Sequence, residues 1–328
     1  AKEVARVEKT FRGRRYIASV QDKSAEVAAP GYYAATLSDF GVRAEVTATA
    51  RVALYRFTYN GEGPARLLVD TQYGMGGDPT KQIVESDVRL TDKTGLCGTN
   101  RRKCWVDRRY SFAVVFDRAC TAVEELPKQP GEKAPRYVFD FDLRRGESLL
   151  VKVSLSAEGG VAGAQKNLAA ELPGWDFEAV RAAARAQWNG LLGQVVVEGD
   201  EAQKRNFYTS LYHLCIQPND LADVGESSFY STLSCWDTFR AAGPLYTILY
   251  PEKASEFVDS MLEQGKRTGY LPIWTLWGYD NQCMIGTHSV PMIVDAWLKG
   301  VWPASACRGD RDGTVESAYQ QIKETLTQ

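Results

Sequence analysis

Residues 278–288, with the sequence GYDNQCMIGTH, bring several reactive side chains into one short run. A carboxylate, an amide, a thiol, a thioether and an imidazole are supplied by Asp280, Asn281, Cys283, Met284 and His288. Two tryptophans, Trp274 and Trp277, come just before them. A metal site, a nucleophile site, a sugar site and a crowded piece of core are the four interpretations to weigh.

Zinc and thiol chemistry fit this stretch poorly. The chain has only two histidines, His213 and His288, so a zinc site built on several histidines is nearly excluded. Cys283 has no partner at the C-x-x-C spacing of a zinc or redox motif. We expect Met284 and Ile285, which separate Cys283 from His288, to be buried, and this disfavours a nucleophilic cysteine.

Sugar binding suits the same residues better. A calcium loop needs several oxygens at alternate positions, and Asp280 and Asn281 alone are too few. Pyranose rings have apolar C–H faces that stack on Trp or Tyr, and a carboxylate or amide can bridge two adjacent hydroxyls. Aromatic rings occur beside Asp or Asn twice, in residues 234–240 and 274–281. The candidate sugar-binding residues are therefore Trp236, Asp237, Arg240, Trp277, Asp280 and Asn281.

Structural roles explain the same residues equally well. The tryptophans would then belong to the core, and Asp237, which precedes TFRAA, would be the N-cap of a helix. His288 could line a pocket, although a structural hydrogen bond is the more common role for such a histidine. The residues alone leave the sugar site and the structural interpretation open.

Composition describes an ordinary globular chain. It has 328 residues, 44% hydrophobic and 24% charged, with a formal net charge of −2, and this length suggests about two domains. The sequence has no cluster of basic residues of the kind that binds a polyanion, so nucleic acid is not an expected partner. No apolar run has the ~18–20 residues of a membrane span. The first residues, AKEVARVEKTFRG, lack the apolar core of a signal peptide, although one could have been removed.

Seven cysteines leave at least one unpaired. Cys97 and Cys104 flank GTNRRK, which we interpret as a turn, so they are expected to form either a local disulfide or two free surface thiols. The other cysteines lie in apolar contexts typical of buried thiols.

Two kinds of pattern divide the chain. Residues 1–160 have many short strand-like runs separated by turn signals, which predicts an antiparallel β-sandwich. Its clearest strand begins at Val42, with Val42 and Val46 expected inward and Glu45 and Thr47 outward. Residues 161–200 are interpreted as a linker with helices, one capped by Asp176, and with a short strand at 194–200.

Helical patterns dominate residues 201–328. We expect helices at 201–217, 250–266, 289–300 and 314–326. In the second, Phe257, Val258, Met261 and Leu262 form an apolar stripe, and in the third Trp297 is expected inward. The loops between these helices carry the candidate site, as is common when helices supply the scaffold.

Three long stretches, at 30–57, 230–262 and 269–300, together with DTQYG at 70–74, resemble glycoside hydrolase family 92, the calcium-dependent exo-acting α-mannosidases. The resemblance implies a β-sandwich N-terminal domain followed by an (α/α)6-barrel catalytic domain, with only the first part of the barrel present. It also implies inversion at the anomeric carbon, a Ca²⁺ ion that contacts the mannose, and a periplasmic or secreted location. The calcium ligands are not assigned by it.

The resemblance also gives the candidate residues their roles. Asp237 and Arg240 would bind hydroxyls of the mannose in the −1 subsite, and Trp236 would shape its wall. Trp277, Asp280 and Asn281 would lie at the same barrel mouth.

The length of the chain departs from the family. The family's general-acid glutamate and general-base aspartate lie in the second half of the barrel, so no catalytic residue is expected here. We therefore expect a fragment whose partners are a mannose-containing glycan and the C-terminal half of the same enzyme. That half would be a second chain or a continuation of this one.

Three hypotheses about function remain. The first is an α-mannosidase or its sugar-binding half, and the second is another (α/α)6 carbohydrate enzyme, such as a phosphorylase or glucan hydrolase. The third is a non-catalytic carbohydrate-binding derivative of such an enzyme.

Overall fold

A computed structural model describes residues 8–11, 14–17, 23–73, 82–104, 106–303 and 314–327. The chain divides into two compact units, residues 1–190 and residues 191–328. The first consists mainly of strands and the second mainly of helices, which confirms the predicted change of character along the chain.

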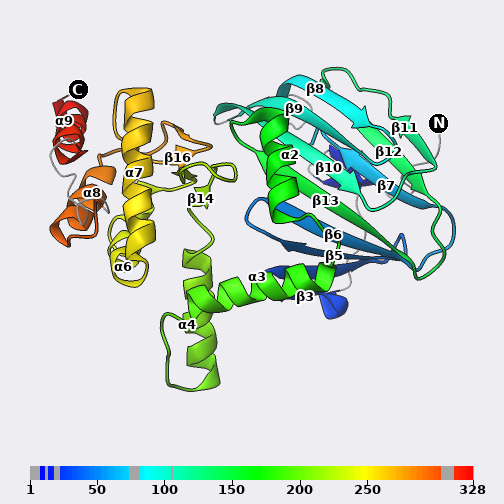
Figure 1. Ribbon diagram of the computed structural model, residues 1–328, viewed down its shortest axis with the longest axis horizontal. Helices are drawn as coiled ribbons and strands as arrows, with labels where there is room; N and C mark the ends of the chain where they lie inside the picture. Colours follow the sequence, from blue (N-terminus) through cyan, green and yellow to red (C-terminus); the bar gives the residue numbers. More distant parts are fainter. Residues whose placement is uncertain are drawn as a thin grey trace. The chain divides into compact units, whose positions relative to one another are not determined.

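Antiparallel sheets form the first unit, with every strand pairing to its neighbours in the antiparallel sense (Figure 1). The larger sheet has eight strands, in the order β3 (Val27–Ala29), β4 (Tyr32–Leu37), β5 (Val42–Ala48), β6 (Val52–Tyr59), β13 (Ser148–Ser156), β10 (Asp107–Phe116), β9 (Gly95–Lys103) and β8 (Ile83–Thr91). The smaller sheet has the order β11 (Ala122–Glu125), β12 (Arg136–Phe141) and β7 (Ala65–Asp70). A short hairpin, β1 (Glu8–Phe11) and β2 (Arg14–Ile17), and a single 3-10 turn, η1 (Lys23–Ala25), come before them.

The two sheets share one hydrophobic core. Phe116 of the larger sheet meets Phe139 and Phe141 of the smaller one edge to face, with ring centroids 4.8 and 5.3 Å apart. Leu149 and Val151 of β13 are buried in the same cluster. Edge-to-face aromatic pairs contribute beyond the area that they bury, so these rings fix how one sheet lies on the other.

Helices cover the opposite face of the larger sheet. Helix α2 (Gly160–Glu171) lies across β13 and β10 (Figure 1), and α3 (Phe177–Leu192) begins after the predicted cap, where Asp176 accepts from the N–H of Ala179 at 2.9 Å. Phe177 packs with Tyr32 in a cluster on this face. The structure divides the chain between residues 190 and 191. The predicted domain boundaries at residues 160 and 200 remain predictions.

The burial of β5 departs from the prediction: Val42 is buried as expected, but Glu45 and Thr47 are buried too and Val46 is only half-buried. Glu45 and Thr47 are 8% and 2% exposed, because α3 covers their face of the sheet. Glu45 accepts hydrogen bonds from Arg56 Nε at 2.7 Å and from the Tyr32 hydroxyl at 2.6 Å. Arg56 in turn pairs with Glu178 of α3 at 2.9 Å. The Arg56 guanidinium lowers the pKa of the Glu45 carboxyl.

The prediction of a local disulfide between Cys97 and Cys104 is also wrong. GTNRRK is not a turn but part of strand β9, so Cys97 and Cys104 lie about 23 Å apart along an extended chain, far beyond disulfide reach. Cys97 is buried beside Ala113 and Ala164, and Cys104 is exposed. The expectation of two surface thiols therefore holds for Cys104 only.

The second unit is built on helices joined by two small hairpins. Its helices are α4 (Glu201–Leu214), α5 (Cys235–Thr238), α6 (Ala242–Leu249), α7 (Pro251–Thr268), α8 (Ser289–Leu298) and α9 (Thr314–Thr327). The hairpins pair β14 (Asn219–Asp220) with β15 (Tyr230–Ser231), and β16 (Thr275–Leu276) with β17 (Tyr279–Asp280). Helix α7 contacts α6, α8 and α9, and α8 and α9 lie on the same side of it (Figure 1).

The sequence of α7 explains its central place. Pro251 occupies the first turn, where its missing N–H costs nothing, and Gly269 ends the helix with a φ of 85°. The predicted stripe is confirmed, since Phe257, Val258 and Met261 are all buried in it. These side chains form the core against which the neighbouring helices pack.

Residues 194–200 and Trp297 differ from the prediction. Residues 194–200 form no strand. Trp297 is 49% exposed, because the buried stripe of α8 runs through Ser289, Met292, Ile293 and Ala296 and leaves Trp297 outside it.

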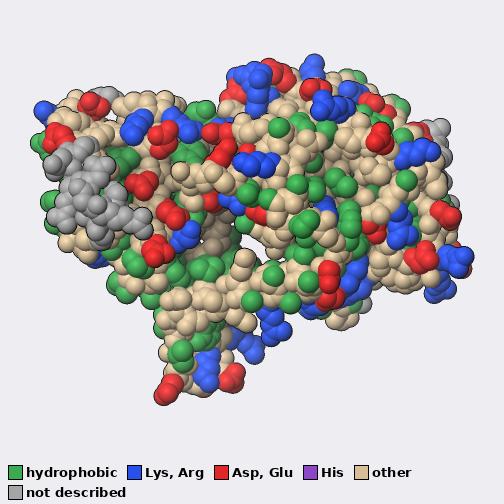
Figure 2. All heavy atoms as spheres, viewed as in Figure 1, with side chains coloured by type: hydrophobic (Ala, Val, Ile, Leu, Met, Phe, Trp, Pro, Cys, Tyr) green, Lys and Arg blue, Asp and Glu red, His purple; other side chains and the backbone are tan. Residues whose placement is uncertain are grey.

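The surface matches the near-neutral composition. In Figure 2 acidic and basic side chains are interspersed over the visible face. None of the helices within the described ranges has the length and apolar character needed to cross a lipid bilayer.

Candidate functional site

Trp277, which comes just before residues 278–288, lies at the tip of a tight hairpin. Strands β16 and β17 are joined by Trp277 and Gly278, whose φ values of 55° and 81° are those of a type I′ turn. A Cβ on Gly278 would lie 2.9 Å from the ring of Phe229, so only glycine fits there. The Gly278 N–H also donates to Ser231 Oγ at 2.7 Å. The turn thus presents Trp277 at a fixed point of the chain.

Main-chain hydrogen bonds join this hairpin to the other aromatic stretch. Thr275 N–H donates to Leu233 O at 2.9 Å, and Leu233 N–H donates to Thr275 Oγ1 at 3.1 Å. Cys235 N–H donates to Ile273 O at 2.9 Å. The structure therefore brings together residues 231–237 and 273–282, which are separated by helices α6 and α7 in the sequence.

Asp237 lies on α5 beside this junction, with its side chain exposed. Its alternative role as the helix N-cap is wrong, because the cap is Ser234, whose Oγ accepts from the Asp237 N–H at 3.3 Å. Arg240 follows within one turn, its guanidinium 4.9 Å from the centroid of the Phe239 ring. Within the described ranges, the Asp237 carboxylate and Arg240 guanidinium have no hydrogen bond or ion pair. Both are therefore available to a ligand, next to the half-buried Trp236.

Asp280 is engaged differently from Asp237. It is only 9% exposed, and its carboxylate accepts three main-chain hydrogen bonds, from Ile273, Trp274 and Gln282. Asn281 Oδ1 accepts from the Cys283 N–H at 2.9 Å, which closes a small turn. The side-chain oxygens of Asp280 and Asn281, two of the predicted sugar-binding residues, thus already accept hydrogen bonds within the loop.

Strained backbone is concentrated in the same loops. Among the described residues, five non-glycine residues have positive φ, and four of them are Thr232, Trp277, Gln282 and Met284. A β-branched residue such as Thr232, with φ of 64°, is an outlier in this region. Such conformations persist where the surrounding structure fixes them, and they often mark functional loops.

His288 lies just before α8 and packs on Phe239 with ring centroids 4.4 Å apart. Its Nδ1 is buried and makes no hydrogen bond to any described residue, so the structure supplies no structural bond at that atom. The ring contact places His288 beside the segment that carries Asp237 and Arg240.

The cysteines of this region show no sign of an activated thiol. Burial raises the pKa of the Cys235 thiol to about 12, so this thiol stays protonated. Cys283 is exposed, and the expectation that its neighbours are buried is wrong, since Met284 and Ile285 are 48% and 81% exposed.

Possible metal ligands are scattered. In the part of the chain that the structure describes, no three His, Cys, Asp or Glu side chains converge on a common point. The calcium ion implied by the resemblance has no carboxylate-rich set of ligands among these residues.

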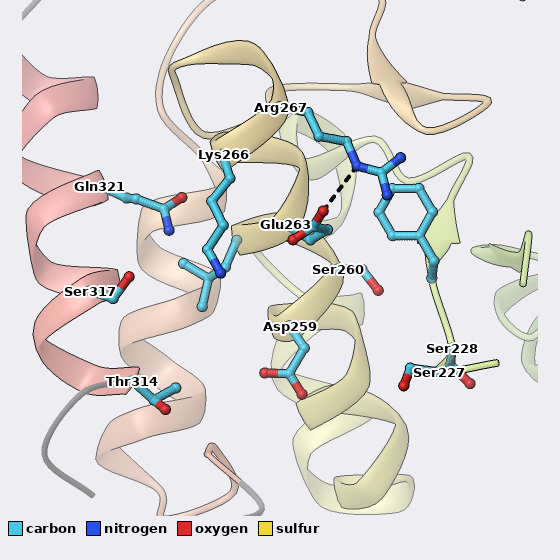
Figure 3. Close-up of a pocket in the computed structure, with 12 residues that line it drawn as sticks. Ser227, Ser228, Asp259, Ser260, Glu263, Lys266, Arg267, Thr314, Ser317 and Gln321 are labelled. Atoms are coloured by element: carbon cyan, nitrogen blue, oxygen red, sulfur yellow. Dashed lines mark hydrogen bonds and ion pairs between the residues drawn. The ribbon is translucent and has the colours of Figure 1, made fainter. Parts of the chain in front are cut away.

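A groove of about 620 Å³ lies elsewhere in this unit, between α7, α9 and residues 227–229 (Figure 3). Arg267 donates to Glu263 at 3.1 Å across its wall, and the guanidinium lies 4.2 Å from the centroid of the Phe229 ring. Asp259 accepts from Trp302 Nε1 at 2.7 Å, and burial raises the pKa of its carboxyl. The candidate sugar-binding residues do not line this groove, so we do not assign it to the sugar site.

The residues that hold the two loops together were not singled out from the sequence. Ser234 had a detectable signal, since Ser-x-x-Asp is the spacing of a capping motif. Ser231 and Thr275 had none, because their partners, Gly278 and Leu233, are more than 40 residues away in the chain.

Comparison with known proteins identifies the family. The model of the glycosyl hydrolase family 92 N-terminal domain matches residues 2–156, and that of the family 92 catalytic domain matches residues 163–328. A curated protein of Arthroderma benhamiae named "uncharacterized secreted glycosidase" is 24% identical over 302 residues, which cover 84% of this chain and 36% of that protein.

Solved structures agree in fold. A family GH92 alpha-mannosidase of Bacteroides thetaiotaomicron is 28% identical, with a TM-score of 0.83 over 94% of this chain and 44% of its own; its complex with mannoimidazole gives 0.84. An inverting GH92 mannosidase of the same species is 23% identical, with a TM-score of 0.81 over 97% of this chain and 44% of its own. The chain thus spans less than half the length of these relatives, and it belongs to glycosyl hydrolase family 92.

Proposed function

We propose that the chain supplies the sugar-binding part of an exo-acting α-mannosidase, which hydrolyses terminal α-mannosides of glycans with inversion. Family membership supports a glycosidase, and similarity to an alpha-mannosidase studied with mannoimidazole supports a mannose-like ligand. We also propose that the helical unit is part of an (α/α)6 barrel.

One observation carries the proposal. Asp237 and Arg240 lie within one turn of each other, and neither is bonded to another of the described residues. An unpaired carboxylate and guanidinium can respectively accept from and donate to neighbouring sugar hydroxyls, with charge-assisted bonds in both cases. Trp236 and Trp277 are half-buried beside the same loops and would supply apolar surface for the ring.

The catalytic pair is proposed to come from outside residues 1–328. Inversion requires two carboxyls about 6.5–9.5 Å apart with a water between them. Within the described loops, Asp280 is held by the main chain and Asp237 is assigned to the sugar, so neither is offered as the acid or base. The remaining residues of the enzyme, in this chain or in a second one, are its proposed partner.

Calcium dependence is retained as a proposal for the complete enzyme only. The described residues do not form a fitting set of ligands, so the ion would be held by other residues of the enzyme. A periplasmic or secreted location is proposed because the fungal relative is named as secreted.

The experiment is hydrolysis of a panel of aryl α- and β-glycosides by the complete enzyme, followed by ¹H NMR of the first sugar released. We expect α-mannosides to be cleaved, with β-mannose appearing first. Preference for an α-glucoside would favour another carbohydrate enzyme, and binding of mannosides without cleavage would favour a non-catalytic derivative. Initial release of α-mannose would contradict inversion.

A further inference from the structure

The carboxylate of Asp280 is almost fully used by the main chain. Oδ2 accepts from the N–H groups of Ile273 at 2.5 Å and Trp274 at 3.3 Å, and Oδ1 accepts from Gln282 at 2.6 Å. Because the residue is only 9% exposed, little of the carboxylate is left for a sugar hydroxyl.

These three donors lie on both arms of the β16–β17 hairpin. Ile273 and Trp274 precede β16, whereas Gln282 follows β17, so the carboxylate closes the open end of the hairpin. Gln282 has a φ of 55°, a conformation that needs its surroundings to hold it. Asp280 therefore fixes the path of the loop at both sides.

The hairpin end held by Asp280 is bonded directly to α5. Ile273 O accepts from the N–H of Cys235 at 2.9 Å, and Trp274 forms an isolated bridge with Ser234. Cys235 is the first residue of α5, and Asp237 follows two residues later. Two hydrogen bonds thus connect the Asp280 carboxylate to the start of the helix that carries Asp237.

We propose that Asp280 is a positioning residue that holds Asp237 at the sugar site through Ile273 and Cys235, and that it is not itself a sugar ligand. This inference rests on the proposed function, because it requires Asp237 to bind the sugar. A carboxylate is suited to this role since both of its oxygens accept. In Asp280→Asn one oxygen becomes an NH₂ group, which would face a main-chain N–H.

The test combines kinetics with hydrogen exchange on the complete enzyme. We expect Asp280→Asn to lower kcat/KM for an aryl α-mannoside about tenfold, and the double variant with Asp237→Asn to lose little more than Asp237→Asn alone, because one residue acts through the other. Deuterium uptake should rise in both 231–240 and 271–283 for Asp280→Asn. It should stay unchanged in 271–283 for Asp237→Asn.

A control and a second variant keep the result interpretable. Asp200→Ala removes the N-cap of α4 in the same unit, where Asp200 accepts from Gln203 at 2.8 Å, and it should lower Tm without changing kcat/KM. If Asp280→Asn does not fold, Thr275→Val removes the hydroxyl that accepts from Leu233, a neighbouring bond between the same hairpin and the segment that leads into α5. It should show the same non-additivity with Asp237→Asn.

The outcomes separate this inference from the proposed function. Losses that multiply in the double variant, or uptake in 231–240 that does not change, would overturn the positioning role while leaving the sugar site intact. Parental kinetics for Asp237→Asn would overturn the sugar site and the positioning role together.

Discussion

Replacement of Asp237 by Asn separates a sugar ligand from a structural residue. The carboxylate is exposed, Ser234 rather than Asp237 caps α5, and Asp237 has no side-chain bond to another described residue. Loss of its interaction with a four-residue helix should therefore change the free energy of unfolding by only a few tenths of a kcal/mol. A charge-assisted hydrogen bond to a sugar is worth about 1.5–3 kcal/mol, which corresponds to roughly a ten- to hundredfold loss in kcat/KM.

The assay is steady-state kinetics with an aryl α-mannoside, together with thermal melting of the same preparations. Glu252→Gln is a matched control, since it neutralises an exposed acid in the first turn of α7, and it should leave kcat/KM unchanged. Near-parental kinetics for Asp237→Asn would refute the sugar-binding role. A fall in Tm large enough to explain the lost activity would refute the claim that this carboxylate is structurally free.

The remaining predictions concern stability and assembly. Glu45→Gln should lower the free energy of unfolding by about 1.5–3 kcal/mol in urea titrations at pH 7. Because the pKa of Glu45 is lowered in the folded state, this difference should shrink as pH falls below about 4, and a constant difference would contradict it. Burial raises the pKa of the Tyr246 hydroxyl, so the contribution of Tyr246 to the free energy of unfolding is complete below pH ~10 and is lost as the pH rises further. The difference in Tm between the parent and Tyr246→Phe should therefore narrow above pH ~10, and a widening difference would contradict this. Ser234→Ala should cost about 0.5–1 kcal/mol through loss of the α5 cap, and an unchanged Tm would count against that cap. Residues 1–328 expressed alone should self-associate in sedimentation and lack mannosidase activity, since Ile248, Ile285 and Leu298 are 70%, 81% and 71% exposed; a monomeric, fully active preparation would contradict this.

Helix α7 shows what local sequence can predict. Its apolar stripe was predicted from local spacing and is buried as expected, and its first-turn proline and terminal glycine are local signals of the same kind. The change from strands to helices was visible for the same reason, because both periodicities are read over a few residues.

Strand β5 and the cysteine pair show where local sequence fails. The alternation in β5 was real, but only the position of α3 decides which face is covered, and Arg56 makes it possible to bury Glu45 there. GTNRRK was misinterpreted because its polar residues are typical of a turn, whereas in β9 they pair with β10 and β8.

The candidate site was found only in part. The two aromatic stretches were singled out from the sequence as candidate segments, and the structure places them side by side through Leu233, Thr275 and Ile273. What sequence could not provide was the difference between Asp237 and Asp280. Both follow aromatic residues, but three main-chain donors converge on Asp280, and that convergence depends on the fold of the hairpin.

The most direct test of the central claim is a crystal structure of the complete enzyme with mannoimidazole bound. We expect the Asp237 carboxylate and the Arg240 guanidinium to lie within about 2.6–3.2 Å of the ligand's hydroxyls. We also expect Asp280 to keep its bonds to Ile273 and Gln282. A ligand bound with both Asp237 and Arg240 beyond hydrogen-bond distance would contradict the assignment of the sugar site to this part of the chain.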